Sequence, residues 1–134
     1  FSIDSRLDFV CLVGLSIRGI CTSTSLSQEQ VFGLELAVCE AVNNSIEHSY
    51  SGQEDQKIDV EVLLYAKQII IHVIDYGQSC QSLNIDKKSL EADACTLQEI
   101  EERGRGLGLI CELMDECSYL PGEQKNVFVL KKYI

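Results

Sequence analysis

The sequence has one proline, no tryptophan and no apolar run of about eighteen residues, the length needed to span a bilayer. The apolar stretch at residues 9 to 17 is too short to cross a membrane. It also lacks the basic lead and the small-residue cleavage site of a secretory signal. With 134 residues, 46% hydrophobic and 24% charged, the composition is typical of a compact globular protein. We therefore expect a single domain over residues 1–134 in a soluble, cytoplasmic protein.

Basic residues are scarce. Eleven Lys and Arg stand against 21 Asp and Glu, which gives a formal net charge of −10. Such a surface repels nucleic-acid phosphates and anionic membranes, so we expect no direct nucleic-acid or membrane partner. A protein partner with a basic face fits this charge better. The alternative is that the charge only keeps a small protein soluble.

The sequence has seven cysteines but no C-x-x-C pair and only two histidines. The odd count argues against a disulfide framework, and the missing pairs and few histidines argue against a zinc site. Cys11, Cys39 and Cys111 lie in apolar periodic segments, where a thiol behaves as a small hydrophobic group. We expect reduced, structural thiols in a reducing compartment.

Hydrophobic periodicity predicts helices followed by strands. Ser27 and Gln30 form a capping-box pattern that starts the second helix. The predicted elements are a strand at 1–3, helices at 7–21 and from 27 to about 48, strands at 57–64 and 69–74, a helix near 107–114, and a hairpin of 117–120 and 126–130. This order predicts an α+β fold, a two-layer sandwich with helices on one face of a mostly antiparallel sheet.

Glu40 and Asn44 interrupt the apolar pattern of the second helix. Four residues apart, they lie on one face about 6 Å along the axis, next to residues that face the core. Unpartnered polar groups at such a boundary cost a few kcal/mol each, so a ligand or metal ion is a candidate partner. An amide oxygen suits Mg²⁺, and a carboxylate one turn earlier can orient or deprotonate a hydroxyl. The alternative is a satisfied pair that specifies how the helix packs on the sheet.

Asp75 ends an apolar strand, and Gly77 follows two residues later. A carboxylate there can accept a hydrogen bond from a purine amino group while the glycine lets the base pack against bare backbone. The alternative is a turn in which Asp75 makes its usual local hydrogen bonds.

Three glycines, Gly104, Gly106 and Gly108, stand immediately before the next predicted helix. They can let backbone N–H groups approach a phosphate at the helix N-terminus, and Arg105 would add a positive charge. No Lys-Ser/Thr follows, so the segment is no Walker loop. The alternative is a flexible loop between two helices.

Taken in order, the E-x-x-x-N helix, the D-x-G strand end and the G-x-G-x-G segment resemble those of the GHKL (histidine kinase-like) ATPase superfamily. The chain is more closely similar to its anti-sigma-factor serine/threonine kinases of the RsbW and SpoIIAB type. The best-matching pieces are residues 35–48 and 103–110, with Met114-Asp115-Glu116 beyond them. The resemblance covers essentially the whole chain and implies a Bergerat-type ATP-binding fold.

The resemblance also implies roles for single residues. Asn44 would hold the Mg²⁺ that bridges the ATP phosphates, and Glu40 would be the general base or positioning residue for the attacking hydroxyl. Asp75 would bind the adenine amino group, and Gly77 would form the pocket floor.

The segment Gly104-Arg105-Gly106-Leu107-Gly108 would bind the phosphates and hinge an ATP lid over residues 80–103. The implied activity is Mg-ATP-dependent phosphorylation of a small STAS-type antagonist by a protein that also sequesters a sigma factor, with a possible homodimer. In such a kinase, catalysis is mostly positioning and charge neutralisation.

The chain departs from the family pattern at three points. Ser79 replaces a second glycine after the D-x-G motif, residues 80–103 contain no Thr-Thr-Lys-Pro-like stretch, and Lys125-Asn126 replaces Gly-Thr. These departures motivate an alternative, a regulatory binding module of the same fold without kinase activity. A third hypothesis is the catalytic domain of a two-component histidine kinase.

Overall fold

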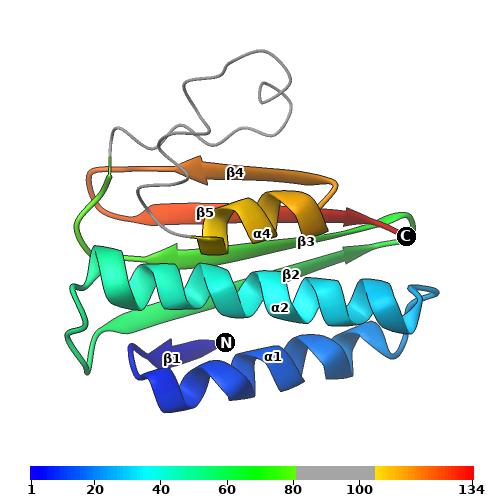
Figure 1. Ribbon diagram of the computed structural model, residues 1–134, viewed down its shortest axis with the longest axis horizontal. Helices are drawn as coiled ribbons and strands as arrows, with labels where there is room; N and C mark the ends of the chain where they lie inside the picture. The colour runs from blue at the N-terminus through cyan, green and yellow to red at the C-terminus, as the bar shows by residue number, and fades with distance from the viewer. Residues whose placement is uncertain (81–104) are drawn as a thin grey trace.

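The computed structural model describes residues 1–80 and 105–134, with only the backbone of Arg105. Its helices are α1 (Leu7–Cys21), α2 (Gln28–Asn44) and α4 (Arg105–Leu113), with a π-helical turn η1 (Ser45–Ser49) continuing α2. Its strands are β1 (Ser2–Asp4), β2 (Lys57–Tyr65), β3 (Gln68–Asp75), β4 (Glu116–Leu120) and β5 (Asn126–Tyr133). Figure 1 shows α2 running along the sheet, with α1 and α4 on either side of it.

The five strands form one sheet in the order β1-β2-β3-β5-β4, and every neighbouring pair is antiparallel. Tyr65 pairs with Gln68, which leaves a two-residue turn between β2 and β3. At the other end of β3, Asp75 pairs with Asn126, the first residue of β5. The last strand is therefore inserted between β3 and β4, and its start lies beside the end of β3.

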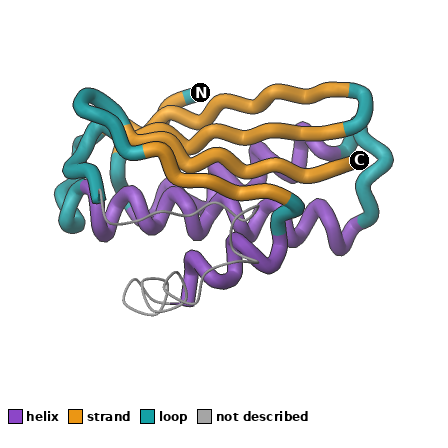
Figure 2. The backbone as a smooth tube through the Cα atoms, turned by 90° about the horizontal axis from the view of Figure 1, so that it is seen from above, coloured by secondary structure: helices purple, strands orange, loops and turns teal. Residues whose placement is uncertain are grey.

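All three helices cover the same face of the sheet, as Figure 2 shows. Ile58, Val60, Ile69 and Ile71 point into this layer and are almost fully buried. The predicted α+β sandwich, with helices on one face of an antiparallel sheet, is confirmed. None of the helices in the described ranges is long and apolar enough to span a membrane.

The capping box at the start of α2 is present. The Gln30 N–H donates to the Ser27 hydroxyl over 3.2 Å, and the Ser27 N–H donates to the Gln30 side chain over 2.9 Å. The predicted end of this helix near His48 is confirmed in position, since helical structure ends at Ser49, but the type of its last turn differs from an α-helix. Regular α-helix stops at Asn44, and the chain continues in the wider π-helical turn η1.

The start of α4 also differs from the prediction. The helix begins at Arg105, so Gly106 and Gly108 lie within its first turns and do not precede it. Leu107, Ile110 and Met114 are buried against the core. The alternative of a flexible loop is therefore wrong for residues 105–108, because the buried side of α4 already begins at Leu107.

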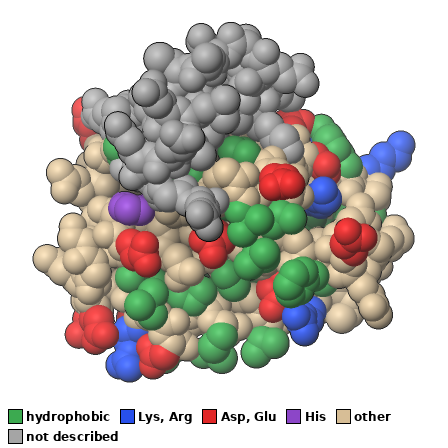
Figure 3. All heavy atoms as spheres, viewed as in Figure 1, with side chains coloured by type: hydrophobic (Ala, Val, Ile, Leu, Met, Phe, Trp, Pro, Cys, Tyr) green, Lys and Arg blue, Asp and Glu red, His purple; other side chains and the backbone are tan. Residues whose placement is uncertain are grey.

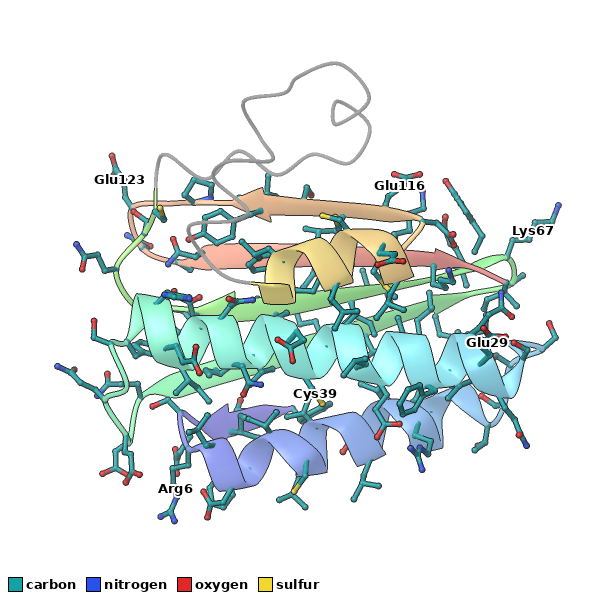
Figure 4. The ribbon with its side chains drawn as sticks, viewed as in Figure 1. Arg6, Glu29, Cys39, Lys67, Glu116 and Glu123 are labelled. Atoms are coloured by element: carbon teal, nitrogen blue, oxygen red, sulfur yellow. The ribbon has the colours of Figure 1, made fainter. Side chains whose placement is uncertain are left out.

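Apolar side chains remain exposed on the helical face (Figure 3). On α1, Leu7, Leu12 and Leu15 are each more than half exposed, and so is Phe32 on α2. Cys11 is exposed as well, so it does not pack into the core as the apolar pattern around it suggested. Cys39 fits the prediction better, since it is half-buried between α2 and α1 (Figure 4).

Asp59 on β2 is the centre of a hydrogen-bonded polar cluster beside the end of β3. It accepts hydrogen bonds from the hydroxyls of Ser2 and Tyr76, the latter over 2.5 Å, and pairs with Lys57 over 2.9 Å. Partial burial alone would raise the pKa of Asp59. The hydrogen bonds from Ser2, Tyr76 and Lys57 outweigh that effect and lower the pKa from 3.8 to about 2. The cluster thereby fastens Tyr76, which lies between Asp75 and Gly77.

The lowered pKa predicts how stability depends on pH. The stabilisation is complete above the unfolded-state pKa near 4 and is lost as pH falls toward 2. After allowance for solvent screening, Asp59→Asn should lower the free energy of unfolding by about 1 kcal/mol at pH 7. Urea unfolding at pH 7, 5 and 3 should show this difference shrinking at pH 3. A constant difference across this range would contradict the assignment.

Candidate active site

Glu40 and Asn44, both on α2, meet the first turn of α4. A Cβ placed on Gly106 would lie 2.6 Å from Glu40 Oε2 and 3.7 Å from Asn44 Nδ2. A side chain at residue 106 would displace the flexible end of the Glu40 side chain. The structure thus brings together Glu40, Asn44 and Gly106, three residues that the sequence pattern singled out.

The Asn44 side chain is buried, with 8% of its surface exposed. Its Nδ2 is the one buried side-chain nitrogen or oxygen among the described residues that lacks a hydrogen-bond partner. An unsatisfied buried amide costs about 1–3 kcal/mol. Rotation of the amide by half a turn exchanges its nitrogen for its oxygen, so Asn44 can offer either a donor or a hard oxygen ligand.

A groove of about 510 Å³ opens beside these residues and is lined by Glu40, Gly106, Gly108, Leu109 and Glu112. The backbone N–H groups at the start of α4 have no partner within the helix, and they carry its partial positive charge. The groove therefore combines an anion-binding helix terminus with two carboxylates. Sequence reasoning missed Glu112, although its position four residues after Gly108 places it on the same face of α4.

The protein alone does not complete a cation site here. The described residues contain no group of three or more His, Cys, Asp or Glu side chains able to hold a metal ion. Mg²⁺ bound with a nucleotide needs only one or two protein ligands, because phosphates and water supply the rest. The orphaned Asn44 amide beside the helix terminus fits a Mg-nucleotide better than a bare metal ion.

Asp75 is almost completely buried, with 2% of its surface exposed, and four donors contact its carboxylate. Oδ1 accepts from the Asn126 side chain over 2.8 Å and from the Gly77 N–H over 3.1 Å. Oδ2 accepts from the hydroxyls of Ser45 over 2.9 Å and Ser49 over 3.0 Å. The local turn hydrogen bond weighed as the alternative is present, and three long-range hydrogen bonds add to it.

Gly77 packs directly against η1. A Cβ at this position would lie 2.3 Å from the Ser49 carbonyl oxygen, so only glycine fits. The Gln78 N–H donates to the same carbonyl over 2.8 Å, and the Tyr76 N–H donates to the Tyr50 hydroxyl, also over 2.8 Å. The turn after β3 is thus hydrogen-bonded to η1 and Tyr50, and the lack of a side chain at Gly77 allows the two backbones to approach.

Sequence reasoning missed Ser45, Ser49 and Asn126 as partners of Asp75. The two serines lie four residues apart, a spacing that shows their common face but not what they contact. Asn126 stands where the family pattern has Gly-Thr, and its amide donates to Asp75 and to the Gly77 carbonyl, the latter over 3.3 Å. A signal for Asn126 therefore existed in that departure from the pattern.

The remaining predicted site residues are only partly described. Gly104 and nearly all of the predicted lid at 80–103 lie outside the described residues. Arg105 is placed by its backbone alone, as the first residue of α4. The Leu107 side chain is in the core, with 1% exposed, so only its backbone can serve a ligand in the groove.

Comparison with known proteins agrees with this geometry. Residues 4–132 match the family model described as a histidine kinase-like ATPase domain. The chain is 34% identical to the serine-protein kinase RsbW of Listeria monocytogenes, over 97% of this chain and 83% of that protein. It is 31% identical to RsbW of Bacillus pumilus, over 85% of this chain and 72% of that protein.

Among solved structures, the SiaB-SiaC complex from Pseudomonas aeruginosa contains a chain with the same fold. The TM-score is 0.55 at 15% identity, covering 100% of this chain and 89% of that one. The structural likeness supports the fold, and the sequence matches support the family. The chain therefore belongs to the histidine kinase-like ATPase family, among the RsbW-type serine-protein kinases.

Proposed function

We propose that this protein is a Mg-ATP-dependent serine kinase that phosphorylates a small STAS-type antagonist and sequesters a sigma factor. The orphaned amide of Asn44, held beside Glu40 and the start of α4, is the observation that carries the proposal. A polar atom left without a partner in an RsbW-type chain is best explained by a ligand that the chain binds.

Glu40 in the groove, Asn44 beside Gly106 and the start of α4 would divide the work of phosphoryl transfer. Bound Mg-ATP supplies the phosphoryl group and a divalent charge that neutralises its oxygens. Asn44 would hold the metal ion through its amide oxygen, and the N–H groups at the start of α4 would hold phosphate oxygens. Glu40 accepts the proton of the attacking serine hydroxyl and orients that oxygen. Lining the groove, its carboxylate is open to a substrate side chain.

Adenine recognition at Asp75 requires an exchange of hydrogen bonds. A carboxylate has about four lone-pair sites, and protein donors occupy all four. Ser45 is buried, whereas Ser49 is only half-buried and its hydroxyl can rotate away. Asp75 Oδ2 would therefore accept the adenine amino group in place of the Ser49 hydroxyl.

The same chain in a binding-only role is the second candidate. The four protein donors on Asp75 favour it, because they satisfy the carboxylate without nucleotide. In that role the protein would hold its sigma factor whether or not ATP is present. Partner binding measured with and without Mg-ATP, together with phosphate transfer to the antagonist, separates the two candidates.

Dimerisation of the protein stays a prediction, which sedimentation velocity can test.

Glu40→Gln should reduce phosphate transfer to the antagonist by about a hundredfold or more, because the amide cannot accept the hydroxyl proton. Affinity for Mg-ADP should remain nearly unchanged. Glu47→Gln, an exposed change on η1, serves as the matched control and should retain full activity. Full activity in Glu40→Gln would remove Glu40 from the mechanism.

Asn44→Leu replaces the orphaned amide with an apolar group of similar shape. The nucleotide-free variant should be as stable as the parent or more stable by about 1 kcal/mol, because a buried unsatisfied group is removed. Its thermal shift with Mg-ADP should vanish. At a hundred times the dissociation constant, that shift corresponds to about 2.7 kcal/mol in the parent.

Asn126→Leu is the matched control for Asn44→Leu, since the Asn126 amide is hydrogen-bonded. This variant should lose about 1–3 kcal/mol of unfolding free energy. If Asn44→Leu were equally destabilised, or kept its nucleotide response, the proposed role of Asn44 would be wrong.

Ser49→Ala tests the exchange at Asp75. Removing the hydroxyl leaves Oδ2 with an open acceptor site, so affinity for Mg-ADP should be equal or tighter. Asp75→Asn should weaken it at least about tenfold, which is about 1.4 kcal/mol. Calorimetric titration of both variants checks this. A Ser49→Ala protein that bound nucleotide as weakly as Asp75→Asn would show that the hydroxyl itself contacts the ligand.

A further inference from the structure

Two cysteines meet between α4 and β4, on the side of α4 away from the groove. The sulfur atoms of Cys111 and Cys117 lie 3.0 Å apart, and both residues are thiols in the structure. Cys117 is buried, with 3% exposed, whereas Cys111 is half-buried and accessible to a small molecule. Neither residue has a part in the proposed phosphoryl transfer.

The backbone around the pair is held in place. The Met114 N–H donates to the Ile110 carbonyl over 3.0 Å, which continues the last turn of α4. Lys132 donates to the Leu113 carbonyl over 3.0 Å and to Asp115 over 3.2 Å. A disulfide needs its sulfurs about 2.05 Å apart, so the two sulfur atoms need to approach each other by only about 1 Å.

We propose that Cys111 and Cys117 are a redox modification site that closes reversibly into a disulfide linking α4 to β4. A low-molecular-weight disulfide such as oxidised glutathione is the oxidant. The Cys111 thiolate attacks it and releases one glutathione thiol, and the Cys117 thiolate then attacks the mixed disulfide at the Cys111 sulfur and releases the second. The protein loses two electrons and two protons, and the oxidant becomes two thiols.

Three other thiols in the described part of the chain, Cys11, Cys21 and Cys39, are less suited to this chemistry. Burial raises the pKa of Cys21, and burial with the nearby carboxylates of Glu35 and Glu40 raises that of Cys39. Both therefore remain protonated and weakly nucleophilic. Cys11 is exposed and can form a mixed disulfide with glutathione.

Closure would restrain α4 without filling the groove. Cys111 lies on the sheet-facing side with Leu107 and Ile110, whereas Gly108 and Glu112 line the groove. The disulfide forms whether or not the groove binds nucleotide, so this proposal does not depend on the proposed kinase activity.

Peptide mapping of the native protein tests the proposal. After equilibration in glutathione buffers of increasing oxidation, thiol exchange is quenched with acid, the remaining thiols are alkylated in denaturant and the protein is digested with trypsin. No Lys or Arg lies between residues 106 and 124, so Cys111 and Cys117 share the peptide that ends at Lys125. We expect this peptide to lose two hydrogens and to escape alkylation while Cys21 and Cys39 are still alkylated. Dithiothreitol should reverse the change.

Cys117→Ala provides the matched variant. In it, Cys111 should accumulate as the glutathione mixed disulfide, because the resolving thiol is gone. Alkylation of both cysteines in the fully oxidised native protein would overturn the proposal. So would a stable glutathione adduct on Cys111 in the parent chain, or a disulfide that forms only after unfolding in urea.

Discussion

The buried carboxylate of Asp75 is the constraint on which the site depends. A charge removed from water needs hydrogen-bond donors, and Asp75 draws them from the end of α2, the turn after β3 and the start of β5. The π-helical turn places Ser45 and Ser49 on one oxygen. Asn126 reaches the other because β5 pairs with β3 at that end of the sheet. One side chain thereby holds together the helix end, the turn and the ends of two central strands.

That anchoring sets the geometry of the phosphate end of the site as well. Ser45 follows Asn44 directly, so the hydrogen bond that fixes the helix end also fixes the orphaned amide. Gly106, at the start of α4, then lies against the Glu40 carboxylate, and the groove opens beside them. The proposed adenine and phosphate subsites are thus joined through two consecutive residues of one helix. On the other side of α4, the cysteine pair offers a separate covalent control over the same helix.

Most of the fold could be predicted from the sequence. Residues 7–21, the capping box at Ser27 and the alternation of β2 carry strong local signals, and the structure reproduces them. The π-helical turn could not be foreseen, because its serines donate hydrogen bonds to Asp75, which lies thirty residues away in sequence from Ser45. The contact of Gly106 with Glu40 could not be predicted either, because the side chain that faces a glycine is known only once the neighbouring helix is placed.

The central claim is that Asn44 lacks a partner because a Mg-nucleotide supplies one. The side-chain amide signals of Asn44, assigned by their loss in Asn44→Leu, can be followed by ¹⁵N-correlated NMR during titration with Mg-ADP. The account predicts a large shift of these signals that saturates with nucleotide and requires Mg²⁺, with a smaller response at Asn126. Unchanged Asn44 signals under saturating Mg-ADP would contradict it.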